Sequence, residues 1–283
     1  MNKDNFYSPS LRNKDEAGLA VPQSPNIQAV FFDIDGTLVS FKTHSIPPST
    51  KAAINQLRNK GIKVVIATGR SLSDIINLEG LTFDGFITAN GAYCADSEGV
   101  VIAQNPISRE SLDRLAIYMK EKPFSCSFMT DKGNFINHID DLMLSLSKLV
   151  KVPLPPEKPV AEILKHTIYQ LDAFIDAERE TELLTHVLTD CIGCRWHPIF
   201  VDFNDQNCSK ATGMDRMMDY FGLSAAHTMA FGDGGNDISM LQHATIGVAM
   251  GNAKVNVKAA ADYVSTTVDD NGVANALKRF NLL

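Results

Sequence analysis

The sequence predicts an α/β fold, a doubly wound and mostly parallel sheet that carries an inserted α+β domain. Two observations lead there. Short apolar runs alternate with helical periods in residues 27–92 and again in 197–283. Residues 93–196 instead contain hairpin patterns around "DSEG" and "DKGN". Alternating strands and helices require right-handed crossovers and a parallel sheet, whereas hairpins give antiparallel pairs. We therefore expect a core domain from the two outer segments and an inserted domain between them.

The first core segment contains three predicted strands and two predicted helices. The strands are "QAVFFDI", "IKVVIAT" and "FDGFITANG", and the helices between them are "SIPPSTKAAINQLRNKG" and "SLSDIINLEG". The second strand is a continuous run of β-branched and apolar residues, which is typical of a parallel strand buried on both faces.

The second core segment repeats this rhythm. We expect a helix at "CSKATGMDRMMDYFGL", a strand and loop at "TMAFGDGG", a helix at "NDISMLQHA", a strand at "IGVAM" and a closing helix at "NGVANALKRF". Residues 1–26 are polar and contain three prolines, so they are expected to form a flexible tail outside the core.

The composition limits the partners. The chain has 283 residues, a net charge of −7 and 45% hydrophobic residues, which fits a globular protein with a sizeable core. Binding to nucleic acid or to an anionic membrane needs concentrated lysine and arginine, so neither partner is expected. Five cysteines, an odd number without framework spacing, indicate reduced thiols and a cytoplasmic location.

Polar clusters follow the predicted strands at their carboxyl ends. They are "DIDGT" at 33–37, "TGR" at 68–70 and "GDGGND" at 232–237, and Lys210 begins a helix just after another apolar run. Ligands of open parallel sheets bind beyond the carboxyl ends of the strands. These three clusters and Lys210 are therefore expected to meet in one site.

The residue types in these clusters point to phosphoryl transfer. Two acids at the end of a buried strand are costly unless a cation compensates their charge. Asp33 can accept a phosphoryl group as a nucleophile, and Asp35 can transfer the proton. Asp233 adds the oxygen ligand that Mg²⁺ prefers. No G-x-G-x-x-G or P-loop pattern occurs, so neither a dinucleotide site nor a P-loop is supported.

At this point the sequence resembles a known family. "FFDIDGTL", "IATGRS", the Ser-Lys pair at 209–210, and "FGDGGNDISML" followed by "VAMGNA" resemble the four motifs of the haloacid dehalogenase (HAD) superfamily. Their order and spacing are similar to those of Cof-type phosphatases, which carry a large α+β (type IIB) cap between the second and third motifs.

The resemblance implies a role for each matching residue. Asp33 would be the nucleophile and a Mg²⁺ ligand, and Asp35 the general acid and base whose backbone carbonyl also meets the metal. The remaining implied roles are phosphate binding by Thr68, Gly69, Lys210 and Asn236, and metal binding by Asp233 and Asp237. In this chain Gly235 stands where the family commonly has a larger residue.

The expected function is a Mg²⁺-dependent phosphatase of small phosphorylated metabolites, with sugar phosphates as the expected class. Two alternatives stay open: a sugar-phosphate phosphomutase and a non-catalytic sugar-phosphate sensor. The insert is expected to set substrate choice, with Tyr93, His138, Trp196 and His197 as polar or aromatic candidates, although ordinary packing or exposure accounts for each of them as well. The sequence leaves open whether the protein is a monomer or a dimer.

Overall fold

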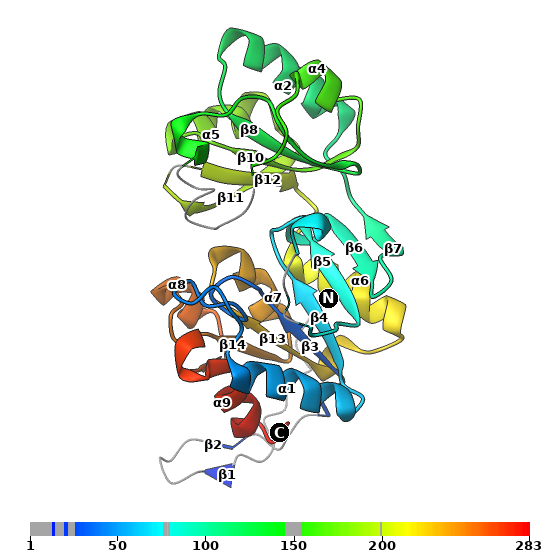
Figure 1. Ribbon diagram of the computed structural model, residues 1–283, viewed down its shortest axis with the longest axis vertical. Helices are drawn as coiled ribbons and strands as arrows, with labels where there is room; N and C mark the ends of the chain where they lie inside the picture. The colour runs from blue at the N-terminus through cyan, green and yellow to red at the C-terminus, as the bar shows by residue number, and fades with distance from the viewer. Residues whose placement is uncertain are drawn as a thin grey trace, which may run out of the picture.

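The computed structural model describes residues 26–283 except 76–77, 79, 145–153 and 199, together with the short strands β1 (Asn13–Lys14) and β2 (Ala20–Val21). The predicted fold class is confirmed, because a mostly parallel sheet and a separate antiparallel sheet lie one above the other (Figure 1). The expected flexible tail, residues 1–26, lies almost wholly outside the described residues.

The core sheet has eight strands in the order β15-β14-β13-β3-β4-β5-β6-β7. From β15 to β5 all neighbours are parallel, and β6 and β7 are antiparallel. Because parallel strands end at one edge, the loops that follow them gather there. The strands are β3 (Ala29–Phe32), β4 (Lys63–Ala67), β5 (Gly85–Thr88), β6 (Tyr93–Asp96), β7 (Val101–Gln104), β13 (Thr228–Gly232), β14 (Ile246–Ala249) and β15 (Tyr263–Val264).

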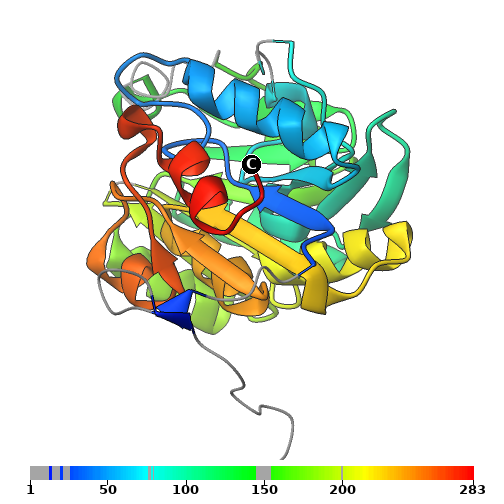
Figure 2. The same cartoon turned by 90° about the horizontal axis from the view of Figure 1, so that it is seen from below.

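Helices cover both faces of the core sheet. One apolar cluster joins α1 (Pro48–Asn59) and α9 (Gly272–Arg279) to the sheet, and another joins α6 (Lys210–Phe221), α7 (Ile238–His243) and α8 (Val255–Ala259) to its other face. Seen from below, blue α1 and red α9 lie on one side of the sheet and yellow α6 lies on the other (Figure 2). The central strands are buried on both faces, which accounts for their uninterrupted apolar sequence.

The cap is a second, antiparallel sheet with helices on one face. Its order is β11-β12-β10-β8-β9. Alternate residues such as Leu171 and Val201 pack in one apolar cluster with the cap helices. The elements are α2 (Arg109–Glu121), β8 (Cys126–Thr130), β9 (Gly133–Ile136), α4 (Val160–Ile163), β10 (Ile168–Ala173), α5 (Ala177–His186), β11 (Cys191–His197) and β12 (Phe200–Asp205). The other face of this sheet looks toward the core (Figure 1).

The boundaries between the core sheet and the cap sheet fall at other residues than the boundaries predicted from the sequence. The hairpin β6–β7 falls in the predicted insert but extends the core sheet, because Thr88 pairs with Tyr93 directly across a tight turn. Strand β12 falls in the predicted core segment but pairs with β10 of the cap. The chain thus leaves the core sheet after Gln104 and leaves the cap sheet after Asp205.

Five short 3-10 helices complete the described structure: η1 (Leu72–Asp74), η2 (Ala89–Gly91), η3 (Ala225–His227), η4 (Gly235–Asp237) and η5 (Val268–Asp270). All five cysteines are free thiols, as expected. Within the part of the chain that the structure describes, no helix is long and apolar enough to cross a membrane.

Candidate active site

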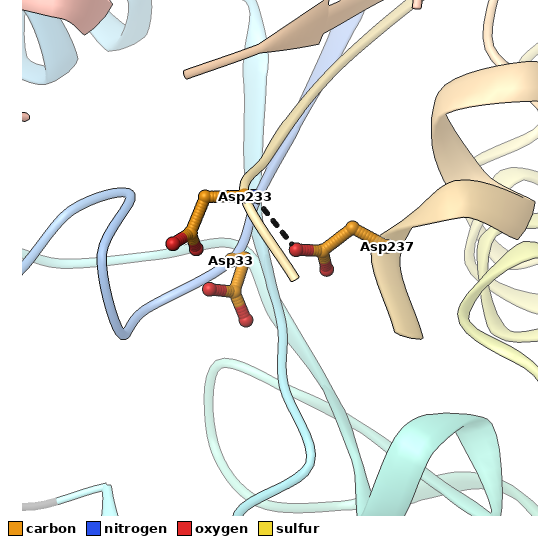
Figure 3. Close-up of side chains that lie close together, drawn as sticks. All are labelled: Asp33, Asp233 and Asp237. Atoms are coloured by element: carbon orange, nitrogen blue, oxygen red, sulfur yellow. Dashed lines mark hydrogen bonds between the residues drawn. The ribbon is translucent and has the colours of Figure 1, made fainter. Parts of the chain in front are cut away.

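Three carboxylates meet at the carboxyl edge of the core sheet (Figure 3). Asp33 directly follows β3, Asp233 directly follows β13, and Asp237 ends η4. One oxygen of each lies within 4.8 Å of the others, and Asp33 and Asp237 are buried. Such a set of oxygen ligands, without histidine or cysteine, suits a hard divalent cation. The structure thus brings together three of the four predicted metal residues.

Lys210 neutralises part of this negative charge. Its side chain is fully buried, and its Nζ lies 2.7 Å from Oδ1 of Asp33 and 2.6 Å from Oδ1 of Asp237. Burial acts to lower the pKa of Lys210, but the charges of Asp237 and Asp33 outweigh it and hold that pKa above its ordinary value. Lys210 begins α6, and the Ser209 hydroxyl caps this helix. This N-terminal capping bond fixes the start of the helix and therefore the position of the Lys210 backbone.

One ammonium group does not balance three carboxylates. Burial, together with repulsion by Asp237, raises the pKa of Asp33 well above its ordinary value, although Lys210 opposes the shift. Burial and Asp237 likewise raise the pKa of Asp233 to about 7. A divalent cation would offset this repulsion and hold all three groups in their charged form. The donor set and the excess negative charge therefore both fit a metal site.

Backbone and side-chain donors fix the orientation of two of the acids. Oδ2 of Asp237 accepts hydrogen bonds from the amides of Asp233 (2.9 Å, dashed in Figure 3) and Gly234 (2.8 Å). Oδ2 of Asp233 accepts one from Nδ2 of Asn252 at 3.0 Å. Gly36 has φ +83°, and a Cβ there would stand 2.2 Å from Oδ2 of Asp233. Only glycine therefore fits between Asp35 and the acidic cluster.

The second acid of "DIDGT" has a different partner. Arg70 Nε donates to Oδ2 of Asp35 at 2.8 Å, and Arg70 Nη2 donates to Oδ1 at 2.6 Å. This two-bond pairing fixes the plane of the carboxylate. It forms because β3 and β4 are neighbours and both motifs follow their strands. The side chain of Asp35 therefore lies outside the cluster of three acids, and its predicted contact with the metal rests on its backbone carbonyl.

Arg70 is a functional candidate that the sequence analysis did not assign, although "TGR" contains it. The backbone amide of Arg70 donates to Oγ1 of Thr68 at 3.1 Å, which shapes the loop after β4. Thr68 is buried, and Cβ of a residue at Gly69 would stand 3.2 Å from Oδ1 of Asn90. The loop thus has little room for larger side chains.

One cavity of about 740 Å³ lies between the core edge and the cap. Most of the predicted site residues line it, whereas Lys210 reaches Asp33 from within the core. The core side of the cavity is lined by Asp33, Asp35, Thr68, Gly69, Arg70, Asp233 and Asn236. The cap side includes Ser127, Met129, Asn134, Gln170, Asp172, Phe174, Arg195 and Asp202.

Buried amides join the cap to the core loops. Asn90 adopts a left-handed conformation (φ 53°) and accepts a hydrogen bond from Nδ2 of Asn236 at 2.9 Å. Its own Nδ2 donates to Oε1 of Gln170 at 3.0 Å, and Gln170 Nε2 donates to the backbone carbonyl of Gly69 at 3.1 Å. The cap strand β10 is therefore tied directly to Asn90 and to the Gly69 loop, of which the latter lines the cavity.

Two of the four cap candidates from the sequence lie away from the cavity. Tyr93 packs edge-on against Tyr169, with ring centroids 5.2 Å apart, and belongs to a small apolar cluster at the junction of the two domains. His138 is exposed. Neither lines the cavity. Trp196 and His197 fall in β11, but their side chains lie outside the described part of the structure.

Comparison with known proteins identifies relatives of the whole described region. The family model of haloacid dehalogenase-like hydrolases matches residues 30–277. The protein YkrA of Bacillus subtilis (strain 168) is 34% identical over 259 residues, which cover 90% of this chain and 98% of that protein.

Two solved structures are similar over nearly the full chain. One is described as the HAD subclass IIB sugar phosphatase BT4131; it is 41% identical with a TM-score of 0.85 and covers 90% of this chain and 100% of its own. The other, the HAD phosphatase BT1666 of Bacteroides thetaiotaomicron, is 37% identical with a TM-score of 0.85, covering 95% and 100% of the two chains.

Proposed function

Because the chain belongs to the haloacid dehalogenase-like hydrolase family, we propose that it is a Mg²⁺-dependent phosphatase of small phosphorylated metabolites, with sugar phosphates as its substrates. One observation carries the proposal. The buried carboxylate of Asp33 is paired with Lys210, and the carboxylate of Asp35 is paired with Arg70. Both carboxylates line the same cavity. These two carboxylates are the proposed nucleophile and the proposed proton donor. The likeness to a subclass IIB sugar phosphatase supports the substrate class.

The first step transfers the phosphoryl group to Asp33. Lys210 binds Oδ1 of Asp33, which leaves Oδ2 to attack phosphorus while the bond from phosphorus to the leaving oxygen breaks. In its protonated form, with one oxygen released from Arg70, Asp35 donates a proton to the leaving oxygen, so the leaving group departs as a neutral alcohol. Arg70 holds the Asp35 carboxylate in one plane through both of its oxygens.

The second step returns the enzyme to its starting state. Asp35, now without its proton, accepts one from water, and the water oxygen attacks the phosphorus of the aspartyl phosphate. The products are inorganic phosphate and the free carboxylate of Asp33. Lys210 stabilises the negative charge on the carboxylate as it leaves.

Thr68, Gly69 and Asn236 are the proposed phosphate contacts of the core, and all three line the cavity. Asp33, Asp233 and Asp237, with the backbone carbonyl of Asp35, would hold Mg²⁺, which supplies positive charge for the phosphoryl oxygens when bound.

The test is release of phosphate from p-nitrophenyl phosphate by the full chain with Mg²⁺ and without any bisphosphate. We expect turnover that EDTA abolishes and that added Mg²⁺ restores better than Zn²⁺. Turnover that depends on a sugar bisphosphate would instead identify a phosphomutase. Binding of sugar phosphates without turnover would identify a sensor. Full activity in metal-free buffer would contradict the proposed metal requirement.

A further inference from the structure

The short helix η2, which directly follows β5, has a strained backbone. All three of its residues have positive φ, 47° at Ala89, 53° at Asn90 and 103° at Gly91. For alanine, and less so for asparagine, this left-handed conformation is unfavourable and persists only where the surrounding structure enforces it. The amide of Ala89 donates to the carbonyl of Arg70 at 3.0 Å. The amide of Asn90 donates to the carbonyl of Thr68 at 3.1 Å, so η2 is built onto the loop after β4.

The same three residues lie against the start of α6. A Cβ at Gly91 would stand 2.1 Å from the carbonyl oxygen of Ser209, the residue that caps this helix. Nη1 of Arg216 donates to the carbonyl of Gly91 at 3.0 Å. Because α6 begins at Lys210, η2 is in contact with the loop that carries Thr68 and with the helix that carries Lys210.

The buried amides around η2 satisfy their partners in one direction. The carbonyl of Gly69 can only accept, so Gln170 turns its Nε2 toward that carbonyl and its Oε1 toward Asn90. Nδ2 of Asn90 therefore donates to Oε1 of Gln170 at 3.0 Å and to Oδ2 of Asp202 at 3.3 Å. This leaves Oδ1 of Asn90 to accept from Nδ2 of Asn236 at 2.9 Å. The side chain of Asn90, a residue only 6% exposed, thus has a fixed direction.

The bond between Asn90 and Asn236 links a buried residue to one that lines the cavity. Asn236 lines the cavity and Asn90 does not. A primary amide carries two donor hydrogens, so Asn236 can give one to Asn90 and keep the other for an oxygen of a bound phosphate. The bond to Asn90 fixes the plane of the Asn236 amide, and therefore also fixes the direction of this second hydrogen.

We propose that Asn90 is a positioning residue for phosphate binding, which holds the amide of Asn236 in the direction that a phosphate oxygen requires. The inference rests on the proposed phosphatase function, because that function assigns Asn236 to the phosphate. The strain of η2 then has a physical reason, since a relaxed backbone would direct the Asn90 side chain away from Asn236.

Asn90→Gly removes the amide and keeps the backbone, because glycine adopts positive φ freely. The measurement is the dissociation constant of inorganic phosphate, by titration calorimetry of the full chain with Mg²⁺. We expect it to rise by about three- to tenfold, the effect of one hydrogen bond. Asn271→Gly is the matched control, because Asn271 is also left-handed (φ 62°) but exposed. It should bind phosphate as the wild type does.

A double-mutant cycle separates positioning from a merely structural role. In an Asn236→Ala background, Asn90→Gly should raise the dissociation constant of phosphate by less than about twofold, since no amide remains to be positioned. A residue that only supports the fold would weaken binding equally in both backgrounds. Thermal melts of all variants, and the binding stoichiometry, separate weaker binding from a loss of folded protein.

The outcomes separate this inference from the proposed function. If the wild-type chain binds inorganic phosphate but releases none from p-nitrophenyl phosphate, the proposed function alone fails. If it turns over this ester, the function stands, and an unchanged dissociation constant in folded Asn90→Gly protein overturns the inference. An equal rise in both backgrounds of the cycle, or no phosphate binding by the wild type, overturns it too.

Discussion

The core sheet and the cap sheet meet at the cavity in different ways. The core contributes loops that follow the carboxyl ends of its parallel strands, as for Asp33 after β3 and Asp233 after β13. The cap contributes the face of an antiparallel sheet, with alternate residues such as Gln170 and Asp172 of β10. The core groups form a network of buried charges, as Lys210 and Asp33 do. The cap groups come from several strands and are joined by amide hydrogen bonds, such as the one from Gln170 Nε2 to Oδ1 of Asp172 at 2.8 Å.

This difference suggests that the reacting groups of the core and the substrate contacts of the cap can change independently of each other. Each core group depends on several others, since Lys210, Asp33 and Asp237 form one buried charge network. A change in one alters the charge state of the rest. Asp172 of the cap instead accepts a hydrogen bond from Gln170, and we expect a change of its side chain to leave the core charge network in place. Four variants test this comparison, ordered from the largest expected effect to the smallest.

Asp33→Asn should lower kcat by at least about 10³-fold, because an amide is a very poor nucleophile. The measurement is phosphate release from p-nitrophenyl phosphate. Circular dichroism should show an unchanged fold, and Asp113→Asn should retain wild-type turnover. Wild-type phosphate release by Asp33→Asn would refute the covalent mechanism.

Lys210→Met should lower the free energy of unfolding by about 3–5 kcal/mol, because it leaves two buried carboxylates without their ammonium partner. Urea unfolding in EDTA measures the loss, with the exposed Lys120→Met as control. Mg²⁺ should raise the melting temperature of Lys210→Met more than that of the wild type. A loss below about 1 kcal/mol would mean that Lys210 does not stabilise the acidic cluster.

Arg70→Lys should lower kcat/KM for a sugar phosphate by about 10–100-fold, because lysine keeps the charge but loses the two-bond pairing with Asp35. The loss should be smaller for p-nitrophenyl phosphate, since p-nitrophenolate leaves without a proton. Steady-state kinetics with both esters measure the difference. Equal losses on the two esters would argue against a role of Arg70 in orienting the proton donor.

Asp172 should make the metal-free protein less stable as pH rises. Its folded pKa is raised from 3.8 to about 7, mainly by burial, so the folded state keeps a proton that the unfolded state releases. This contribution is complete below pH 3.8 and is lost as pH rises through about 7.

When the pH rises from 5 to 8, the free energy of unfolding should therefore fall by about 2 kcal/mol less in Asp172→Asn than in the wild type. Denaturant unfolding at several pH values measures this difference. Mg²⁺ should leave it in place, because Asp172 lies outside the cluster of three acids, whereas Mg²⁺ should reduce the pH dependence that comes from Asp233. An identical pH dependence in wild type and variant would contradict the raised pKa.

The core site could be predicted because its groups lie in short contiguous motifs. Asp33 and Asp233 follow apolar strands, and Lys210 begins a helix. The pairing of Arg70 with Asp35 could not be read from the chain, since it depends on two loops from neighbouring strands. The arginine was visible in "TGR", but its partner was not.

The residues on the cap side of the cavity do not lie in a recognisable sequence motif. In "HTIYQLDAFI", Gln170 and Asp172 occupy alternate positions, a pattern equally typical of a strand with one face in water. Only the docking of this face onto the core buries Gln170 to 1% exposure. The hairpin β6–β7 was predicted as a hairpin, but its sheet was not, because strand pairing across a tight turn fits either domain.

The pairing of β3 with β13 has a consequence for how the protein is made. Ala29 lies opposite Thr228, so about 200 residues must be synthesised before β3 gains this neighbour. At roughly 5–20 residues per second, the wait is about 10–40 s. The cap strands, complete at Asp205, all emerge earlier. During that interval β3 has an unpaired apolar edge, the kind of edge that recruits other chains. We therefore expect nascent or truncated chains that stop before Thr228 to depend on chaperones far more than the finished protein does.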